Sequence, residues 1–222
     1  MQIRGGIVNK RQLISLIEQT RTFDAASAKV ELEQYATDAI AAVELVFIAG
    51  FVHDDLHGRL VIDLGTGTGR LAISALCMGA WRVVGLEIDP HALALAMENA
   101  RAFGLERRLD LVLGDVLAGS NLLYPRLLGA TIIMNPPFGV QSKGADARFL
   151  RAAMAIPGVD VIYSIHLKNE KNRTFLQNLV KDGGWKVVEM HQTMMILPRL
   201  YYFHEKKRKE IEVDIYRIHP SR

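Results

Sequence analysis

The sequence predicts an α/β protein with a doubly wound, seven-stranded sheet that ends in an antiparallel β-hairpin. Along most of the 222 residues, short runs of β-branched and apolar residues alternate with helical patterns. This alternation is typical of a largely parallel sheet with helices on both faces. The last two expected strands follow each other with no helix between them, and antiparallel neighbours need no crossover helix.

The expected elements alternate in a regular order along the chain. Apolar residues at helical spacing predict helices, and short apolar runs bounded by glycine, proline or polar residues predict strands. Asp89 and Pro90 are typical of a helix start, with Asp89 at the N-cap. The expected helices cover residues 9–21, 37–50, 70–78, 90–103, 145–155 and 170–182. The expected strands cover residues 60–64, 82–87, 109–113, 130–134, 159–165, 185–196 and 211–218.

Composition limits the class of protein. The length suits one domain with a full core, so we expect a single domain over 1–222 with residues 1–30 as an N-terminal helical extension. The single Cys77 excludes a disulfide framework, and the seven histidines show no H-x-x-x-H spacing, so we expect no metal. The apolar run 39–52 is too short to span a bilayer and contains Glu44. Without a signal-peptide pattern either, we expect a soluble, cytoplasmic protein.

A glycine-rich turn follows the first expected strand. Asp63 ends the strand, and Gly65, Gly67 and Gly69 follow at alternate positions. Glycine lets the backbone approach a ligand closely and adopt a positive φ. The spacing is G-x-G-x-G, whereas dinucleotide binders carry G-x-G-x-x-G. These four residues therefore predict a nucleoside cofactor site that favours S-adenosylmethionine (SAM).

Acidic residues follow the next two expected strands. Glu87 is placed to accept hydrogen bonds from both ribose hydroxyls of a nucleoside, a role that SAM and NAD folds share. Asp115 is placed to accept from the adenine amino group of the cofactor, and Val116 to offer its N–H. An exposed loop carboxylate is the alternative interpretation of Asp115.

The stretch Asn135-Pro136-Pro137-Phe138 follows the fourth expected strand. Two prolines keep the backbone extended and remove two N–H donors. The Asn135 side-chain oxygen and the Pro136 carbonyl can then accept from one amino group, which favours a pyramidal nitrogen whose lone pair can reach a methyl group. Phe138 would stack on an unstacked base; a strand-capping loop with Phe138 in the core is the alternative. The motif predicts methyl transfer from SAM to a planar, conjugated nitrogen.

A basic segment lies between the last two expected strands. The net charge is only +3, but the calculated pI is about 9.0 and the positive charge is unevenly placed. Cations interleaved with aromatic residues suit phosphate neutralisation and base stacking. A solvated hairpin turn is the alternative, and the two interpretations are compatible. The residues predicted to contact nucleic acid are Tyr201, His204, Lys206, Lys207, Arg208 and Lys209.

Taken together, these motifs resemble the small METTL-type N6-adenosine methyltransferases of small-subunit ribosomal RNA, in their archaeal and eukaryotic forms. Leu-Glu-Gln-Tyr at 32–35 is quite specific when it occurs with Asn-Pro-Pro-Phe-Gly at 135–139. The resemblance covers about positions 30–218. The matching segments are 32–37, 63–69, 87–89, 114–116, 134–139, 143–146, 163–166, 197–204 and 211–214.

The resemblance implies the Rossmann-like fold of SAM-dependent methyltransferases, SAM as cofactor, and N6 methylation of an adenosine in small-subunit rRNA. The cofactor contacts that it implies are Gln34, Thr37, Gly65, Thr68, Arg70, Glu87, Asp115 and Val116. Two positions depart from the family pattern: Ala36 stands where proline is usual, and Glu87 stands where aspartate is more usual.

The resemblance also implies a partner, a small zinc-binding activator protein that pairs with the third strand. The usual strand order places 109–113 at the sheet edge, with Leu109, Leu111 and Leu113 on one face. An apolar edge strand is a site for pairing with another chain. Coverage by the chain's own termini or by a second copy is the alternative.

Other functions remain as alternatives. DNA adenine, RNA guanine-N2 and protein glutamine are also planar amines; glutamine methyltransferases typically carry Tyr at the position of Phe138, and DNA enzymes usually carry an added recognition segment. A NAD-binding oxidoreductase would leave Asn135 to Phe138 unexplained. A non-catalytic SAM-binding scaffold would not need an intact motif.

Overall fold

The computed structural model describes residues 9–23, 29, 33, 36–118, 129–139, 142–198 and 208–221. Six α-helices lie in these ranges: α1 (Lys10–Glu18), α2 (Ala39–Phe47), α3 (Arg70–Cys77), α4 (Pro90–Ala102), α5 (Ala145–Met154) and α6 (Glu170–Asp182). The strands are β1 (Leu60–Leu64), β2 (Arg82–Glu87), β3 (Leu109–Leu113), β4 (Ala130–Met134), β5 (Val159–Leu167), β6 (Trp185–Pro198) and β7 (Arg208–Pro220). A π-helical turn, η2 (Ile48–Val52), continues α2, and a 3-10 turn, η3 (Val116–Ala118), follows β3.

All seven strands belong to one sheet in the order β3-β2-β1-β4-β5-β7-β6. The first five are parallel, whereas β7 runs antiparallel to both β5 and β6. This arrangement confirms the predicted doubly wound sheet with a terminal hairpin. The strand order reverses between β1 and β4, and open α/β sheets bind ligands at the carboxyl ends of the strands at such a point.

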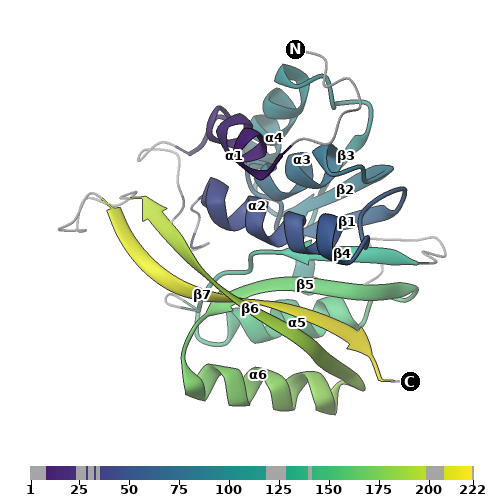
Figure 1. Ribbon diagram of the computed structural model, residues 1–222, viewed down its shortest axis with the longest axis vertical. Helices are drawn as coiled ribbons and strands as arrows, with labels where there is room; N and C mark the ends of the chain where they lie inside the picture. The colour runs from purple at the N-terminus through teal and green to yellow at the C-terminus, as the bar shows by residue number, and fades with distance from the viewer. Residues whose placement is uncertain are drawn as a thin grey trace.

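Helices cover both faces of the sheet. The core on one face is built from α1, α2 and α3, with Leu13, Leu45 and Ile73 fully buried. The core on the other face is built from α5 and α6, with Leu150 and Leu176 buried. Figure 1 shows β5, β6 and β7 passing between α2 on one side and α6 on the other. Among the described helices, none has the length and apolar character needed to cross a bilayer.

Helix boundaries follow the local capping chemistry. Asp38 accepts a hydrogen bond from Ala41 N, so α2 begins at Ala39, two residues after the expected start. Asp89 accepts from His91 N and Pro90 opens α4, which confirms the predicted N-cap. Lys29 Nζ lies 2.9 Å from Asp89 Oδ1 and ties the N-terminal segment to this cap.

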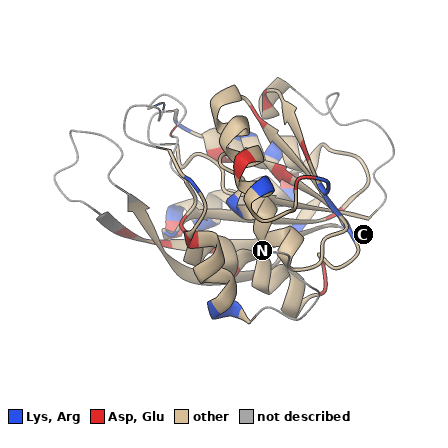
Figure 2. Cartoon of the chain, turned by 90° about the horizontal axis from the view of Figure 1, so that it is seen from above, with Lys and Arg blue, Asp and Glu red and all other residues tan. Residues whose placement is uncertain are grey.

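The hairpin of β6 and β7 is longer than the sequence predicted. Its pairing runs from Trp185 opposite Pro220 to Pro198 opposite Arg208, and it extends from the body of the molecule (Figure 2). Leu167, at the carboxyl end of β5, pairs with Val213, so the start of β7 projects beyond the carboxyl ends of the parallel strands. Tyr201, His204, Lys206 and Lys207 lie outside the described residues, as does the turn that joins the two strands.

Candidate active site

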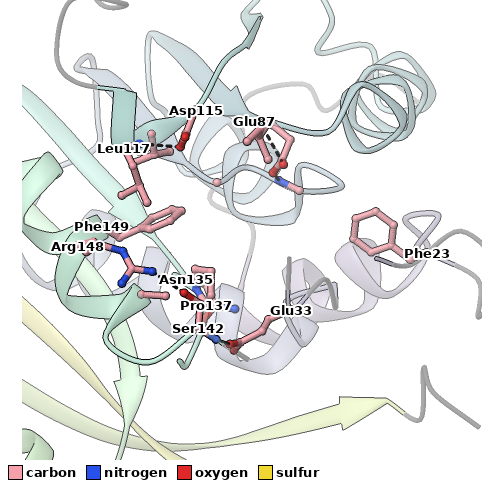
Figure 3. A pocket seen from close by; sticks show the side chains of 15 residues that line it. Phe23, Glu33, Glu87, Asp115, Leu117, Asn135, Pro137, Ser142, Arg148 and Phe149 are labelled. Carbon is pink, nitrogen blue, oxygen red and sulfur yellow. Dashed lines mark hydrogen bonds between the residues drawn. The ribbon is translucent and has the colours of Figure 1, made fainter. Parts of the chain in front are cut away.

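A cavity of about 280 Å³ lies at the carboxyl ends of β1, β2, β3 and β4 (Figure 3). It is near the lower end of the roughly 300–1,000 Å³ typical of small-molecule sites. Its position at the point where the strand order reverses is the one that the fold favours for a ligand. The described residues that line it are Phe23, Glu33, Gly65, Gly67, Glu87, Ile88, Asp115, Val116, Leu117, Asn135, Pro137, Ser142, Ala145, Arg148 and Phe149.

The glycine-rich turn forms one wall of the cavity. Gly65 has φ +71°, and a Cβ built there would lie 3.1 Å from Cε1 of Phe149. Gly69 has φ +83°, and its Cβ would lie 3.2 Å from Cβ of Ala96 in α4. Both positions therefore require glycine, the first for the aromatic wall of the cavity and the second for close contact between the turn and α4.

Asp63 lies fully buried beneath this turn. Its Oδ2 accepts from Thr66 Oγ1 at 2.6 Å and from Ala72 N at 3.1 Å. Its Oδ1 is buried without a hydrogen-bond partner in the described part of the chain. Desolvation raises the pKa of Asp63 to about 7, and the nearby charge of Glu87 adds to the shift. Asp63 therefore supports the turn from below and lies outside the cavity wall.

Glu87 faces the turn from the end of β2. Its Oε1 accepts from the backbone N–H groups of Ile88 at 2.9 Å and Asp89 at 3.0 Å. Its Oε2 accepts from Gly67 N at 2.9 Å. A carboxylate oxygen has two lone pairs, so Oε2 retains acceptor capacity toward the cavity, which Glu87 lines. Desolvation raises the pKa of Glu87 even though the three N–H groups favour the charged form.

Asp115 and Val116 line the wall that follows β3. Asp115 Oδ1 accepts from Leu117 N at 2.8 Å, which turns the chain into η3. Ile88 and Leu117 line the same cavity and remain 47% and 41% exposed. Solvent-exposed apolar side chains beside a cavity suit a planar ring; Ile88 lies in the matching segment 87–89, whereas no sequence pattern pointed to Leu117.

The side-chain amide of Asn135 has one hydrogen-bond partner on its nitrogen, and its oxygen has none among the described residues. Its Nδ2 donates to Thr37 Oγ1 at 3.0 Å, whereas its Oδ1 is buried and has no hydrogen-bond partner among the described residues. Thr37 is held in turn by Arg70, whose Nη1 donates to the Thr37 carbonyl at 2.9 Å. Arg70 Nε also donates to Thr20 Oγ1 at 2.8 Å, and burial lowers the pKa of this guanidinium.

The structure therefore divides the residues predicted to bind the cofactor or to act in catalysis. Those on the cavity wall are Gly65, Gly67, Glu87, Asp115, Val116, Asn135 and Pro137. Those described outside the wall are Thr37, Asp63, Thr68, Gly69, Arg70, Pro136 and Phe138. Phe138 packs against the core on the α2 face. Gln34 lies outside the described residues.

A further wall comes from the start of α5 and from the N-terminal segment. Glu33 accepts from Gly139 N at 3.1 Å and from Ser142 N at 3.3 Å. Arg148 donates to Ser142 Oγ at 2.6 Å and lines the cavity beside Phe149 (Figure 3). No sequence pattern pointed to Arg148 or Phe149; the matching segment 143–146, just before them, is the nearest signal.

The segments 143–146 and 163–166, both of which match the family pattern, lie close together beside the Asn135 loop. Met134, the residue before Asn135, pairs with Ser164 in the sheet. Ser164 Oγ lies 2.7 Å from His166 Nε2, and His166 Nδ1 lies 3.6 Å from Asp146 Oδ2. These buried contacts fasten α5 to β5 at the level of the cavity.

Known proteins resemble both the part of the chain that forms the glycine-rich turn and the chain as a whole. Residues 40–132 match the family model described as Ribosomal protein L11 methyltransferase (PrmA). The chain is 34% identical to the rRNA N(6)-adenosine-methyltransferase METTL5 of Danio rerio, with 95% of this chain and 99% of the relative covered. It is also 34% identical to the uncharacterized protein MJ0284 of Methanocaldococcus jannaschii, with 96% and 94% covered. The crystal structure of PH1948 from Pyrococcus horikoshii, described as a candidate RNA methyltransferase, matches with a TM-score of 0.84 and 35% identity over 97% of this chain and 99% of that chain.

The fold and the cavity at its switch point define a SAM-dependent methyltransferase. Within that class, the chain belongs to the METTL5-type family of rRNA N6-adenosine methyltransferases. The match to the L11 methyltransferase family ends at residue 132, before Asn135. That match therefore covers the turn and the carboxylates, whereas the alignments with the METTL5-type relatives extend over 84% or more of the chain.

Proposed function

We propose that the protein methylates N6 of an adenosine in small-subunit ribosomal RNA. The observation that carries this proposal is the buried Oδ1 of Asn135, which has no partner among the described residues and lies at a cavity bordered by the glycine-rich turn. A buried acceptor without a donor costs free energy. A donor from a bound substrate, such as an exocyclic amine, would remove that cost.

When bound, SAM supplies an electrophilic methyl group on its sulfonium. Asn135 Oδ1 and the Pro136 carbonyl accept from the two hydrogens of the target amine and turn its lone pair toward that carbon. Asn135 and Pro136 would hold the amine in this orientation while the methyl group is supplied, and the proton that the amine loses would pass to water. Positioning and preorganised acceptors are sufficient for this transfer, because it needs no covalent enzyme intermediate.

The cavity wall fits the cofactor expected of this family. Glu87 Oε2 has acceptor capacity for a ribose hydroxyl, and Asp115 with Val116 can address the adenine edge. Ile88 and Leu117 offer apolar surface for the faces of the adenine. Gly65 and Gly67 leave room for the backbone to contact the rest of the cofactor.

The RNA would approach along the hairpin of β6 and β7. The start of β7 projects beyond the carboxyl end of β5, on the side where the cavity opens. The backbone N–H of Ile196 in β6 also contacts the carboxylate of Asp38, next to Thr37. The described parts of β6 and β7 thus lie beside the edge of the cavity, and we include the basic residues Lys206, Lys207, Arg208 and Lys209 in the proposal as phosphate contacts. Tyr201 and His204 belong to the same proposal.

A partner could pair with β3, which lies at the edge of the sheet as expected. Leu113 at its carboxyl end is 58% exposed, whereas Leu109 at its start is 2% exposed. Only the second half of the strand thus offers apolar surface. We include in the proposal a small activator protein that adds a strand at this edge.

The test combines a methyl-transfer assay with identification of the product. The purified protein, SAM carrying an isotopically labelled methyl group and small-subunit rRNA should yield N6-methyladenosine after digestion and mass spectrometry. Asn135→Ala should lower the signal at least about a hundredfold, whereas Gln177→Ala, an exposed amide on α6, should retain it. Label in N2-methylguanosine of the rRNA, or label in DNA or in a protein glutamine when these are offered in place of rRNA, would support one of the alternative planar amines instead.

A further inference from the structure

Three side chains of types that can bind a metal lie close together on the α2 face of the sheet, apart from the cavity. They are those of His53, which follows η2, and of Glu189 and His191 in the edge strand β6. Their three donor atoms lie within 4.8 Å of one another. The three side chains are 21%, 35% and 34% exposed, respectively, so the group is accessible from solvent but partly enclosed.

A β-bulge directs the two strand residues toward His53. Val187 pairs with Ile218, and Glu189 pairs with the next residue of β7, Arg217, so Val188 is an extra residue in β6. Side chains alternate between the faces of a sheet, and the extra residue reverses this alternation. Val187 packs on the α6 side, whereas Glu189 and His191 lie on the α2 side with His53. Without the bulge, the carboxylate would lie on the opposite face.

The two imidazoles converge on one carboxylate. His53 Nε2 lies 2.5 Å from Glu189 Oε2, and His191 Nε2 lies 2.9 Å from Glu189 Oε1. Both ring nitrogens are buried, and in the described part of the chain neither makes a contact with the alignment of a hydrogen bond. Arg217, which pairs opposite Glu189, donates from Nη2 to Asp55 Oδ2 at 2.9 Å, so its charge is already matched there.

We propose that His53, Glu189 and His191 bind a divalent transition-metal ion of the Zn²⁺ type. Two imidazole nitrogens and one carboxylate oxygen are the donors that zinc accepts, with a fourth position left for water. Magnesium and calcium prefer all-oxygen sites. Zinc–ligand bonds of about 2.0–2.2 Å place tetrahedral donors roughly 3.3 Å apart, so a modest separation of the present contacts accommodates the ion. The ion would fasten the edge strand β6 to the end of η2.

This proposal revises the expectation of no metal. Histidine spacing along the sequence did not reveal the group because His53 is far from Glu189 in the chain, and because the bulge at Val188 is not visible as a motif. The site is independent of the proposed methyl transfer, since its residues do not line the cavity. The measurement can therefore succeed or fail whatever the RNA substrate is.

The full chain is first treated with EDTA. It is then titrated with ZnCl₂, and calorimetry follows the binding. We expect one equivalent to bind, and saturating zinc to raise Tm by roughly 5 °C, as for a ligand at about a hundred times its Kd. Glu189→Gln, His53→Ala and His191→Ala should each weaken this binding at least tenfold and remove the shift in Tm. His91→Ala, an exposed histidine at the start of α4, should bind as the parent does. MgCl₂ should give no shift.

Two further measurements separate the loss of metal binding from the loss of folding in the variants. Co²⁺ should give the visible absorption of a site with nitrogen ligands in the parent and not in Glu189→Gln. Circular dichroism and Tm in EDTA establish that each variant folds before zinc is added. If the parent binds no stoichiometric zinc, or if the three variants bind it as well as the parent, the group is a histidine–glutamate contact only and the proposal is wrong.

Discussion

Asn135 donates through Nδ2 to Thr37 Oγ1 at 3.0 Å, and this single contact fixes which way its amide faces. With the amide nitrogen turned to Thr37, the oxygen faces away from it and lacks a partner among the described residues. Arg70 holds the Thr37 carbonyl in turn. The sequence analysis expected Thr37 and Arg70 at the cofactor; their observed contacts instead orient the motif residue, and their role toward SAM stays a prediction.

Replacing Thr37 by valine should lower kcat while leaving the affinity for SAM nearly unchanged. Valine keeps the shape but removes the acceptor for Asn135 Nδ2, and loss of a neutral hydrogen bond costs about 1 kcal/mol, or roughly fivefold in rate. Thr37→Ser keeps the hydroxyl and should restore the rate. Steady-state kinetics with calorimetry of SAM binding would measure both effects; equal losses in Thr37→Val and Thr37→Ser would argue against an orienting role.

Glu87→Ala should weaken SAM binding by about 1–3 kcal/mol, the usual cost of losing a hydrogen bond to a charged group. The carboxylate also accepts from Gly67 N, so part of this loss would come from a less ordered turn. Calorimetry measures the affinity for SAM, and the change in Tm measures how much the loss of the contact with Gly67 destabilises the protein. Glu98→Ala, an exposed carboxylate on α4, serves as the control. Unchanged affinity in Glu87→Ala would remove the ribose assignment.

Gly65→Ala should destabilise the cofactor wall more than Gly58→Ala does. Gly65 and Gly58 have similar φ values, +71° and +68°, but a Cβ at Gly65 lies 3.1 Å from Phe149 Cε1, whereas a Cβ at Gly58 meets no atom within 4 Å. The backbone strain of about 1 kcal/mol is common to both, so the difference isolates the clash. Chemical denaturation gives the two values, and Phe149→Leu in the Gly65→Ala background should recover part of the loss.

Asp63 should make the protein less stable as pH rises from about 4 to about 7. Its pKa is raised from 3.8 to about 7 by burial, so the native state binds more protons than the unfolded state in that window. The free energy of unfolding then falls with increasing pH, by up to about 1 kcal/mol per unit from this group. Asp63→Asn removes this contribution. Urea denaturation at several pH values should show a smaller fall in the variant than in the parent; parallel curves would contradict the buried protonation.

The fold could be predicted from the sequence because strands such as β1 and β4 are short, mostly apolar runs that end at glycine, proline or polar residues. All seven strands and six helices lie where their patterns indicated, and Asp89 caps α4 as its Asp-Pro pair suggested. The strands β6 and β7 are longer than expected, because they pair with each other beyond the end of β5. The residue pattern within one strand does not indicate how many of its residues pair with the neighbouring strand.

The site was predicted less completely than the fold. Glycines and carboxylates at strand ends are local signals, and Gly65, Gly67, Glu87 and Asp115 do line the cavity; their contacts with SAM stay predictions. Arg148, Phe149 and Glu33 reach it through tertiary packing, which spacing does not encode. Phe138 was expected to meet a base, yet it packs partly against the core on the α2 face, and its stacking role stays a prediction.

The proposed mechanism depends on Asn135 Oδ1 accepting a hydrogen bond from the target amine. Its most direct test is single-turnover methylation of small-subunit rRNA by Asn135→Ala, together with the Kd for SAM measured by calorimetry. We expect a rate at least about a hundredfold lower with SAM affinity nearly intact, because the acceptor acts chiefly in the transition state. Methylation at the parent's rate would show that Asn135 is a structural loop residue and would contradict the mechanism.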